Sequence, residues 1–137
     1  MQNKFPFISG SVIKGQKIAR KLGYPTINVN PPSDFLLDFG VYAGFMEYNG
    51  KEYPGVINYG FTPCFEVKKP KFEIHIFDFN HDMYGKIVKI VPTHYLRSEI
   101  KFKNIDILIQ QIKKDCLNSY NYYMDNNFPK ASKPDKL

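Results

Sequence analysis

The chain has 137 residues, 43% of them hydrophobic and 16% aromatic, which is enough apolar material for one compact domain with a real core. Its formal net charge of +6 favours anionic ligands, but the basic residues are scattered, which argues against a nucleic-acid arm or a polybasic membrane patch. The two cysteines lack C-x-x-C spacing, so neither a disulfide framework nor a zinc knuckle is indicated.

The residue types and the first third of the chain favour short strands. Ile, Val, Phe and Tyr are frequent and Trp is absent, a balance typical of β-structure. Ile8 to Lys14 predicts a first strand, which opens into a basic, glycine-punctuated loop from Gly15 to Gly23. Polar and β-branched residues then alternate from Thr26 to Asn30. This alternation predicts a short strand with its polar side chains on one face.

The middle of the chain contains a clear hairpin signal. Residues 33–39 predict a loop or a single helical turn, and Val41–Tyr48 and Glu52–Tyr59 are both strand-like. Between these two runs stands Asn49-Gly50, whose residues tolerate the positive φ of a type I′ turn. We therefore expect an antiparallel hairpin here, followed by an irregular segment from Gly60 to Pro70.

The next run, Lys71 to Phe79, predicts another strand with one apolar face. Its apolar residues alternate with Glu73 and His75, so these two side chains point the other way, toward solvent or toward a lined cavity. Taken alone, a solvated strand face is the simpler interpretation, because most carboxylates on half-buried strands sit in water.

The last predicted strand runs from Lys86 to Val91 and is closed by Pro92. A turn at residues 80–83 precedes it. The total is about six strands with short links, an arrangement that tends to close into a small barrel and so hide its edges.

The final third predicts one amphipathic helix. It begins from a possible N-cap at Asn104, and its apolar stripe should pack on the barrel. From Met124 onward the chain is polar and contains proline, which predicts a loosely ordered tail. We therefore expect one domain over residues 1–123 and a tail over 124–137. The predicted stripe consists of Ile105, Leu108, Ile109, Ile112 and Cys116.

Two groups of residues could hold a metal ion. Thr26 and Asn28 lie two positions apart on a strand and offer a hydroxyl and an amide oxygen on one side, which are hard ligands suited to Mg²⁺. His75, Asp78 and the His81-Asp82 pair are close in sequence, but strand alternation sends His75 and Asp78 to opposite faces. The second group is therefore the weaker candidate.

The segment from Gly10 to Asn28, GSVIKGQKIARKLGYPTIN, resembles the opening signature of the riboflavin kinase (flavokinase) family. The likeness covers about residues 7–120, nearly the whole expected fold. It continues in order through Gly40-Val41-Tyr42, Asn58-Tyr59-Gly60, Phe72–Phe79, Tyr84-Gly85-Lys86, Leu96-Arg97-Ser98-Glu99 and Lys101-Phe102.

This resemblance implies a mainly β fold, a six-stranded antiparallel barrel of Greek-key type with a C-terminal helix packed on it. It also implies transfer of the γ-phosphate of ATP to the ribityl 5′-hydroxyl of riboflavin, giving FMN and ADP. The metal would be Mg²⁺, with Mn²⁺ or Zn²⁺ as alternatives. The implied partners are riboflavin and ATP, and we expect a cytoplasmic monomer that binds neither nucleic acid nor membranes.

The resemblance further implies roles for individual residues. Glu73 would be the catalytic base, and Thr26 and Asn28 would bind Mg²⁺ and phosphate oxygens. Arg97 would contact the FMN phosphate or fix the flap through Glu99. ATP would lie beneath the 15–23 flap on Gly10, Val12, Gly15, Lys21, Gly23, Pro25, Thr26, Asn28, His75 and Tyr84. Riboflavin or FMN would contact Asn58, Glu73, Leu96, Arg97, Glu99 and Phe102.

The chain departs from the family pattern at two positions. Ala19 stands where the family usually has Gly, and Cys64 replaces a usual Thr after Pro63. We expect these changes to alter affinity without abolishing the chemistry. Bacterial relatives usually carry an adenylyltransferase domain before the kinase, so the chain is expected to be either a standalone kinase or an excised domain.

Two other functions remain open at this point. The positive charge and the many Tyr and Phe residues would suit a non-enzymatic barrel that binds single-stranded nucleic acid. A barrel that carries FMN without kinase activity is the other alternative. Oligonucleotide binding that weakens steeply with salt would favour the former, and tight FMN binding with indifference to ATP the latter.

Overall fold

The structure is a computed structural model that describes residues 5–15, 23–61 and 70–125, and every structural statement below refers to these residues. The predictions made for Ala19, Lys21 and Cys64, and for the tail beyond residue 125, lie outside them.

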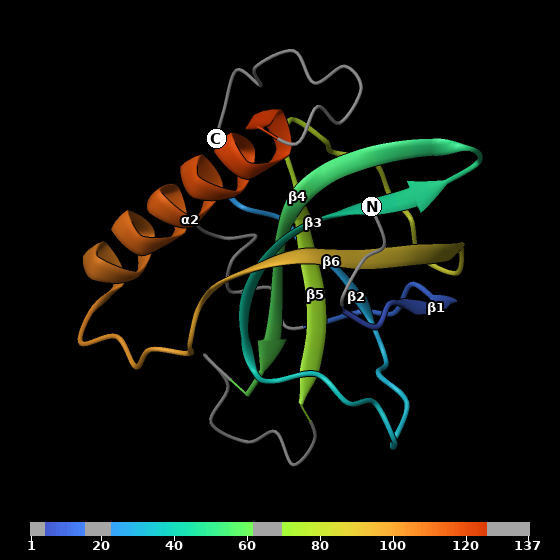
Figure 1. Cartoon of the computed structure of the whole chain (residues 1–137), viewed down its shortest axis with the longest axis horizontal. Coiled ribbons are helices and arrows are strands. Elements are labelled where there is room, and N and C mark those ends of the chain that lie inside the picture. The colour runs from blue at the N-terminus through green and yellow to red at the C-terminus, as the bar shows by residue number, and fades with distance from the viewer. Residues whose placement is uncertain (1–4, 16–22, 62–69, 126–137) are drawn as a thin grey trace.

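Six antiparallel strands form one sheet in the order β1-β6-β3-β4-β5-β2, curved into a nearly closed barrel (Figure 1). Strands β3, β4 and β5 pair in sequence, and β6 returns to lie beside β3, which is the Greek-key order. This confirms the predicted fold. The strands are β1 (Ile8–Ser11), β2 (Ile27–Val29), β3 (Gly40–Tyr48), β4 (Lys51–Gly60), β5 (Lys71–Ile76) and β6 (Ile87–Arg97).

One bridge joins the two edges of the sheet. Just after β1, Ile13 pairs with Asn28 of β2, and the Ile13 N–H donates to the Asn28 carbonyl at 2.8 Å. Because the edge strands β1 and β2 are short, this contact lets the sheet close and leaves little unpaired edge. Asn28, predicted as a metal ligand, therefore lies at the seam of the barrel.

Alternating residues of the strands fill the barrel. Met46, Ile57, Phe72, Ile74 and Ile90 have no exposed surface and belong to one core cluster. Their neighbours along each strand point to the outside of the barrel. The outer face of β3 is nevertheless also buried: residues 41–46 are all buried, because a helix covers that side.

The predicted hairpin is confirmed. Strands β3 and β4 pair from Tyr48↔Lys51 to Gly40↔Tyr59, and the turn residues Asn49 and Gly50 have φ values of 51° and 77°. Both angles are positive, as a type I′ turn requires. The turn therefore fixes the register that the site depends on.

Strand β6 differs from its prediction, because it continues past Pro92 to Arg97. The β3–β6 pairing shifts by one residue between Ala43 and Gly44, opposite Pro92, and again between Val41 and Tyr42. These shifts are β-bulges, and a bulge tolerates proline because the inserted residue interrupts the hydrogen-bond ladder. The second bulge brings Arg97 opposite Val41.

Three other strands are shorter than predicted, and the first of them, β2, lacks one predicted residue at each end. Strand β1 ends at Ser11 and not at Lys14, since Val12 already exchanges backbone hydrogen bonds with the turn at Gly85 and Lys86. Strand β5 ends at Ile76 and not at Phe79, because Asp78 adopts a left-handed φ of 51° that breaks an extended strand.

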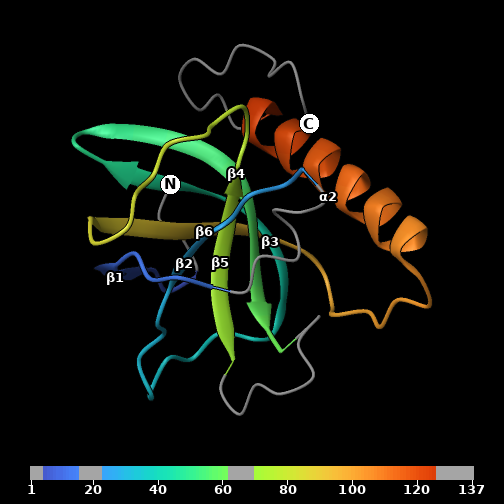
Figure 2. The ribbon, with the colours of Figure 1, turned by 180° about the vertical axis from the view of Figure 1, so that it is seen from behind.

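Helix α2 (Ile105–Asp125) lies obliquely across the outside of the barrel, as the two views show (Figures 1 and 2). Asn104 caps it as predicted, since its side-chain oxygen accepts from the Ile107 N–H at 2.9 Å. The helix includes Met124, where the tail was predicted to begin. Ile105 is 60% exposed, so the predicted apolar stripe is wrong at its first position.

The later turns of α2 hold the helix on the sheet. Cys116, Ser119 and Tyr123 are buried, and the Ser119 hydroxyl donates to the Gly55 carbonyl of β4 at 2.7 Å. No helix within the described residues is long and apolar enough to cross a membrane.

Close approach of strands β4 and β5 requires glycine at position 55. A Cβ added there would lie 2.2 Å from the His75 carbonyl oxygen, and backbone cannot yield as a flexible side chain can. We expect Gly55→Ala to lower the free energy of unfolding by about 2 kcal/mol or more through overpacking, measured by urea denaturation. Gly10→Ala is the matched control, because a Cβ there has open space. Equal stability of the two variants would contradict this account.

Candidate active site

The polar side chains of the site form one row across five strands. Glu73 of β5 pairs with Asn28 of β2 on one side and with Asn58 of β4 on the other. Asn58 pairs with Val41 of β3, and Val41 pairs with Arg97 of β6. Residues directly opposite each other in a sheet point to the same face. The row therefore presents its side chains together on the outer face of the barrel, on the side that α2 covers.

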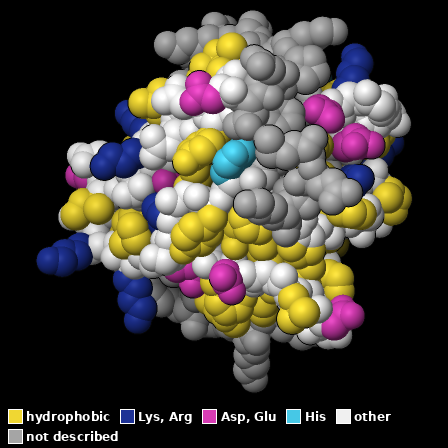
Figure 3. Space-filling model, viewed as in Figure 1, with side chains coloured by type: hydrophobic (Ala, Val, Ile, Leu, Met, Phe, Trp, Pro, Cys, Tyr) yellow, Lys and Arg dark blue, Asp and Glu magenta, His cyan; other side chains and the backbone are white. Residues whose placement is uncertain are grey.

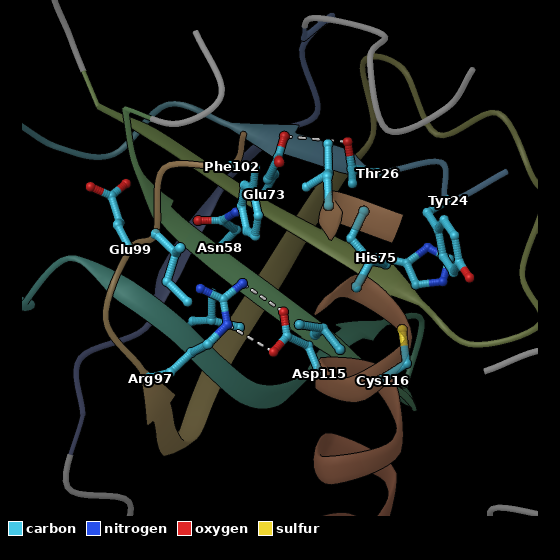
Figure 4. A pocket seen from close by; sticks show the side chains of 15 residues that line it. Tyr24, Thr26, Asn58, Glu73, His75, Arg97, Glu99, Phe102, Asp115 and Cys116 are labelled. Carbon is cyan, nitrogen blue, oxygen red and sulfur yellow. Dashed lines mark hydrogen bonds and ion pairs between the residues drawn. The ribbon is translucent and has the colours of Figure 1, made fainter. Parts of the chain in front are cut away.

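A cavity lies between this row and helix α2, and Figure 4 shows its walls. We call it the helix cavity. Strands supply most of its polar floor, and the helix and the loop before it supply a mostly apolar cover. Its lining comprises Tyr24, Thr26, Val41, Val56, Asn58, Glu73, His75, Arg97, Glu99, Ile100, Phe102, Leu108, Ile112, Asp115 and Cys116.

A second hollow lies on the other side of Thr26, against the turn that follows β5. We call it the turn cleft. Thr26 lines both hollows and thus marks the place where they meet. The turn cleft is lined by Val12, Gly15, Pro25, Thr26, Ile27, Asn28, Ile76, Phe79, Asn80, His81, Asp82, Met83 and Tyr84.

Glu73 is the carboxylate at this junction. Protein atoms surround it on most sides, and this burial raises the pKa of Glu73 from the usual 4.5 to about 7. The Lys71 charge and the hydrogen bond from Thr26 lower the pKa and offset only part of the effect. A carboxyl group with this pKa can accept a proton near neutral pH and can also release it.

Thr26 and Asn28 lie beside this carboxylate. The Thr26 hydroxyl donates to Glu73 Oε2 at 3.3 Å, and Asn28 Nδ2 donates to Thr26 Oγ1 at 3.4 Å. Both hydrogen bonds are long and therefore weak. Asn28 is buried beneath Gly15, where an added Cβ would lie 2.4 Å from the Asn28 amide.

These oxygen atoms fit a Mg²⁺ ion that also contacts a phosphate. A hydroxyl, an amide oxygen and a carboxylate are hard ligands, and the weak bonds between them cost little to replace. Within the described residues, no group of three or more His, Cys, Asp and Glu side chains could hold a metal by themselves. Mg²⁺ in such sites is usually bound by one or two protein groups, with water and substrate phosphates as its other ligands.

Arg97 is clamped to the helix. Its Nε and Nη2 donate to the two carboxylate oxygens of Asp115 at 2.8 and 2.7 Å, and Gln111 donates to the same carboxylate at 2.9 Å. Nη1 donates to the Ser98 carbonyl. This bidentate pair orients the guanidinium rigidly. The partner that the structure gives Arg97 is Asp115, which the sequence interpretation did not include.

Glu99 and Asn58 complete the polar wall. Glu99 accepts a hydrogen bond from the Phe61 N–H at 2.8 Å and so ties the loop before α2 to the end of β4. The side-chain oxygen of Asn58 is buried and, within the described residues, has no hydrogen-bond partner. Such an acceptor is costly to leave unpaired, so it favours a ligand with a hydroxyl or amide donor.

The Cys116 thiol lies in the cavity wall without reactive character. Burial, aided by the neighbouring Asp115 charge, raises the pKa of Cys116 to about 12. The thiolate is therefore scarce at neutral pH, and the thiol acts as an apolar contact.

The predicted flavin-site residues come together with one exception. Asn58, Glu73, Arg97, Glu99 and Phe102 all line the helix cavity. Leu96 does not, because it is the inserted residue of the second bulge in β6 and therefore falls outside the row.

The predicted nucleotide-site residues are divided. Gly10 and Gly23 line neither hollow, and His75 lines the helix cavity instead of the turn cleft. His75 differs because its side chain lies on the same face as Glu73, two residues before it along the strand. The remaining described residues of this prediction line the turn cleft, namely Val12, Gly15, Pro25, Thr26, Asn28 and Tyr84.

Sequence reasoning missed the contribution of the helix. Leu108, Ile112, Asp115 and Cys116 line the cavity, although three of them were assigned to a packing stripe. Asp115 carried a usable signal, since a carboxylate one position before the buried Cys116 lies at the border of the apolar stripe. In the turn that follows β5, Asn80 and Met83 were treated only as a connection, and His81 and Asp82 only as part of the weaker metal candidate.

Comparison with known proteins agrees with this arrangement. The model of the riboflavin kinase family (Flavokinase) matches residues 3–123. The bifunctional riboflavin kinase/FMN adenylyltransferase of Bacillus subtilis (strain 168) is 41% identical over 121 residues, which is 85% of this chain and 38% of that protein. The chain therefore spans well under half of this relative.

Two solved structures share the fold. A structure described as a macrolide-efflux protein from Streptococcus pneumoniae has a TM-score of 0.71 and 30% identity over 88% of this chain and 38% of that one. The riboflavin kinase of Trypanosoma brucei has a TM-score of 0.61 and 23% identity, covering 93% of this chain and 92% of its own, a likeness that concerns the fold alone. The match of the family model over nearly the whole described chain, together with the related sequences, establishes that this protein belongs to the riboflavin kinase family.

Proposed function

We propose that this chain transfers the γ-phosphate of ATP to the 5′-hydroxyl of riboflavin, with riboflavin in the helix cavity and MgATP in the turn cleft. The observation that supports this most directly is the position of Thr26, which lines both hollows and donates a hydrogen bond to Glu73. A hydroxyl held in one hollow and a phosphate held in the other would meet beside the Glu73 carboxylate.

The helix cavity has the chemistry that riboflavin requires. Its apolar cover, which includes Ile100, Phe102, Leu108 and Ile112, suits the flat isoalloxazine ring. Its polar floor suits the ribityl chain, since the unpartnered Asn58 oxygen can accept from a ribityl hydroxyl. Apolar and polar parts of one ligand would thus contact matching parts of one cavity.

The turn cleft has features suited to a nucleotide. Phe79 and Tyr84 line it and can stack on an adenine ring. Lys14 lies 5.7 Å from the centre of the Tyr84 ring and adds positive charge at its mouth. Gly15 carries no Cβ, so phosphate oxygens can approach the backbone closely there.

Glu73 would act as the base of the transfer. As the riboflavin oxygen forms its bond to the γ-phosphorus, the bond from phosphorus to the ADP oxygen breaks, and Glu73 accepts the proton of the attacking hydroxyl. Most of the catalysis in such reactions comes from positioning and charge neutralisation. Glu73 therefore needs to be in the right place more than to be a strong base.

Thr26 Oγ1 and the Asn28 side-chain oxygen would hold the metal and orient the phosphates. Mg²⁺, when bound, neutralises the negative charge that accumulates on the transferred phosphoryl group. Arg97 retains donor hydrogens on its Nη atoms beyond those used for Asp115 and Ser98, so it can contact the FMN phosphate. Mn²⁺ and Zn²⁺ stay alternatives for the same ligands.

The two other functions have less support. An FMN carrier would explain the helix cavity but not a second hollow that shares Thr26 with it. Nucleic-acid binding by stacking would need basic and aromatic side chains together, and Figure 3 shows Lys and Arg spread around the edge of the face it displays. The monomeric state and the cytoplasmic location expected from the sequence stay predictions.

Replacing the base tests the proposal. We expect Glu73→Gln to lower kcat by roughly 100-fold or more, since general-base catalysis contributes about 10²–10⁴-fold, while binding of MgADP is retained. FMN formed from MgATP and riboflavin is measured by chromatography. Glu52→Gln makes the same change on the exposed end of β4 and should keep wild-type turnover. A Glu73→Gln variant as active as Glu52→Gln would remove Glu73 from this role.

The raised pKa of Glu73 predicts the acidic limb of the pH profile. The protonated carboxyl cannot accept the hydroxyl proton, so kcat/KM for riboflavin should fall as the pH is lowered through about 7. A profile that is flat between pH 5 and pH 8 would contradict this prediction.

The assignment of the two hollows is tested by a reciprocal pair of variants. Phe102→Ala should raise the KM for riboflavin by about tenfold through lost apolar contact, with little change in the KM for MgATP. Tyr84→Ala should show the reverse pattern. Each variant is the control for the other in steady-state kinetics, and both KM values changing equally in both variants would refute the partition.

A further inference from the structure

Strand pairing ends immediately before Thr26, although Thr26 lies at the junction of the two hollows. Strands β2 and β5 pair from Val29↔Phe72 to Ile27↔Ile74, and the same register would next place Thr26 opposite His75. The ladder stops one residue short of this pair. The backbone of Pro25 and Thr26 is therefore not held by strand pairing, although the Thr26 hydroxyl lies at the junction of the two hollows.

The side chain of His75 takes over where the ladder ends. Its Nδ1 lies 2.9 Å from the Pro25 carbonyl oxygen. A carbonyl oxygen only accepts hydrogen bonds, so Nδ1 must carry the hydrogen. Burial lowers the pKa of His75, and the hydrogen bond to Pro25 offsets part of this lowering. The neutral tautomer with hydrogen on Nδ1 is the form that matches this geometry.

The imidazole is itself held in place. Tyr24 contacts it edge to face, with ring centroids 5.3 Å apart, and the ring of Phe77, the first residue after β5, lies 6.4 Å away. Figure 4 shows the His75 ring against Tyr24, on the same side of the sheet as Glu73 and Thr26. A ring fixed by packing can hold a flexible backbone segment more firmly than a mobile side chain could.

We propose that His75 is a positioning residue whose Nδ1–H fixes the Pro25 carbonyl, and thereby keeps the Thr26 hydroxyl and the Asn28 amide in reach of Glu73 and of a metal-bound phosphate. This inference rests on the proposed function and adds a role to it. This role requires no contact of His75 with the transferred phosphate or the metal. It replaces, with one side-chain hydrogen bond, the strand pairing that Thr26 lacks.

Side chains that imitate one imidazole nitrogen at a time test this role. The amide nitrogen of Asn can occupy the place of Nδ1, that of Gln reaches nearer the place of Nε2, and Leu fills space without a donor. We expect His75→Leu and His75→Gln to raise the Mg²⁺ concentration needed for half-maximal activity by about tenfold, the equivalent of one lost hydrogen bond. His75→Asn should stay within about threefold of wild type on the same basis.

Two measurements do not depend on turnover. Calorimetric titration with Mn²⁺ and ADP should give the same order of affinity. Wild type and His75→Asn should bind more tightly than His75→Gln and His75→Leu. Nitrogen NMR of the ligand-free wild-type protein should show His75 neutral, with hydrogen on Nδ1 and none on Nε2. Urea denaturation checks that each variant is folded at the assay temperature. If His75→Leu does not fold, the comparison of His75→Asn with His75→Gln is the test.

The outcomes separate this inference from the proposed function. Suppose that wild type makes FMN, and that His75→Leu or His75→Gln matches it in both Mg²⁺ dependence and Mn²⁺–ADP affinity. Then His75 has no positioning role and the kinase assignment stands. If wild type makes no FMN but the affinity order holds, the kinase assignment fails and the positioning role stands. Hydrogen on Nε2 alone, or no binding of Mn²⁺ and ADP by wild type, overturns the inference.

Discussion

The antiparallel register of β2, β5, β4, β3 and β6 is the constraint on which the site depends. It places Asn28, Glu73, Asn58 and Arg97 in one row, so that four polar side chains from distant parts of the chain share one face. A slip of one residue in any of these pairs would turn a side chain toward the apolar interior. The type I′ turn at residues 49–50 and the two bulges in β6 are therefore parts of the site, although they lie outside it.

The row is useful only because α2 covers it. The helix and the loop before it form the wall of the helix cavity opposite the strands. Burial raises the pKa of Glu73, because it disfavours the ionised form in the folded protein. The Arg97–Asp115 pair fixes one side of this cover to β6, and the Ser119 hydroxyl fixes another to β4. Helix docking and the chemistry of the site thus depend on the same contacts.

The segment around Thr26 has to be held in place and yet stay accessible to a ligand. Strand β2 has only three residues, and the segment before it carries the hydroxyl that links the two hollows. A longer ladder would hold that segment but would also use backbone groups beside the turn cleft. A single imidazole bond to Pro25 leaves the segment accessible. His75 lines the helix cavity, and its hydrogen bond reaches Pro25, which lines the turn cleft.

The sequence by itself determined the strands, the hairpin turn, the helix cap at Asn104 and the identity of the family, because these depend on local alternation, on turn chemistry and on an ordered set of motifs. It placed Glu73 and His75 on the face opposite the apolar one, but left open whether that face met water or a cavity. Only the tertiary structure decided this, because the answer depends on where α2 lies. Tertiary structure also decided the roles of Asp115 and Leu96. A bulge in β6 sets the position of Leu96 and leaves no local pattern in the chain. The position of Asp115 at the border of the apolar stripe could be seen in the sequence, but its long-range partner Arg97 could not.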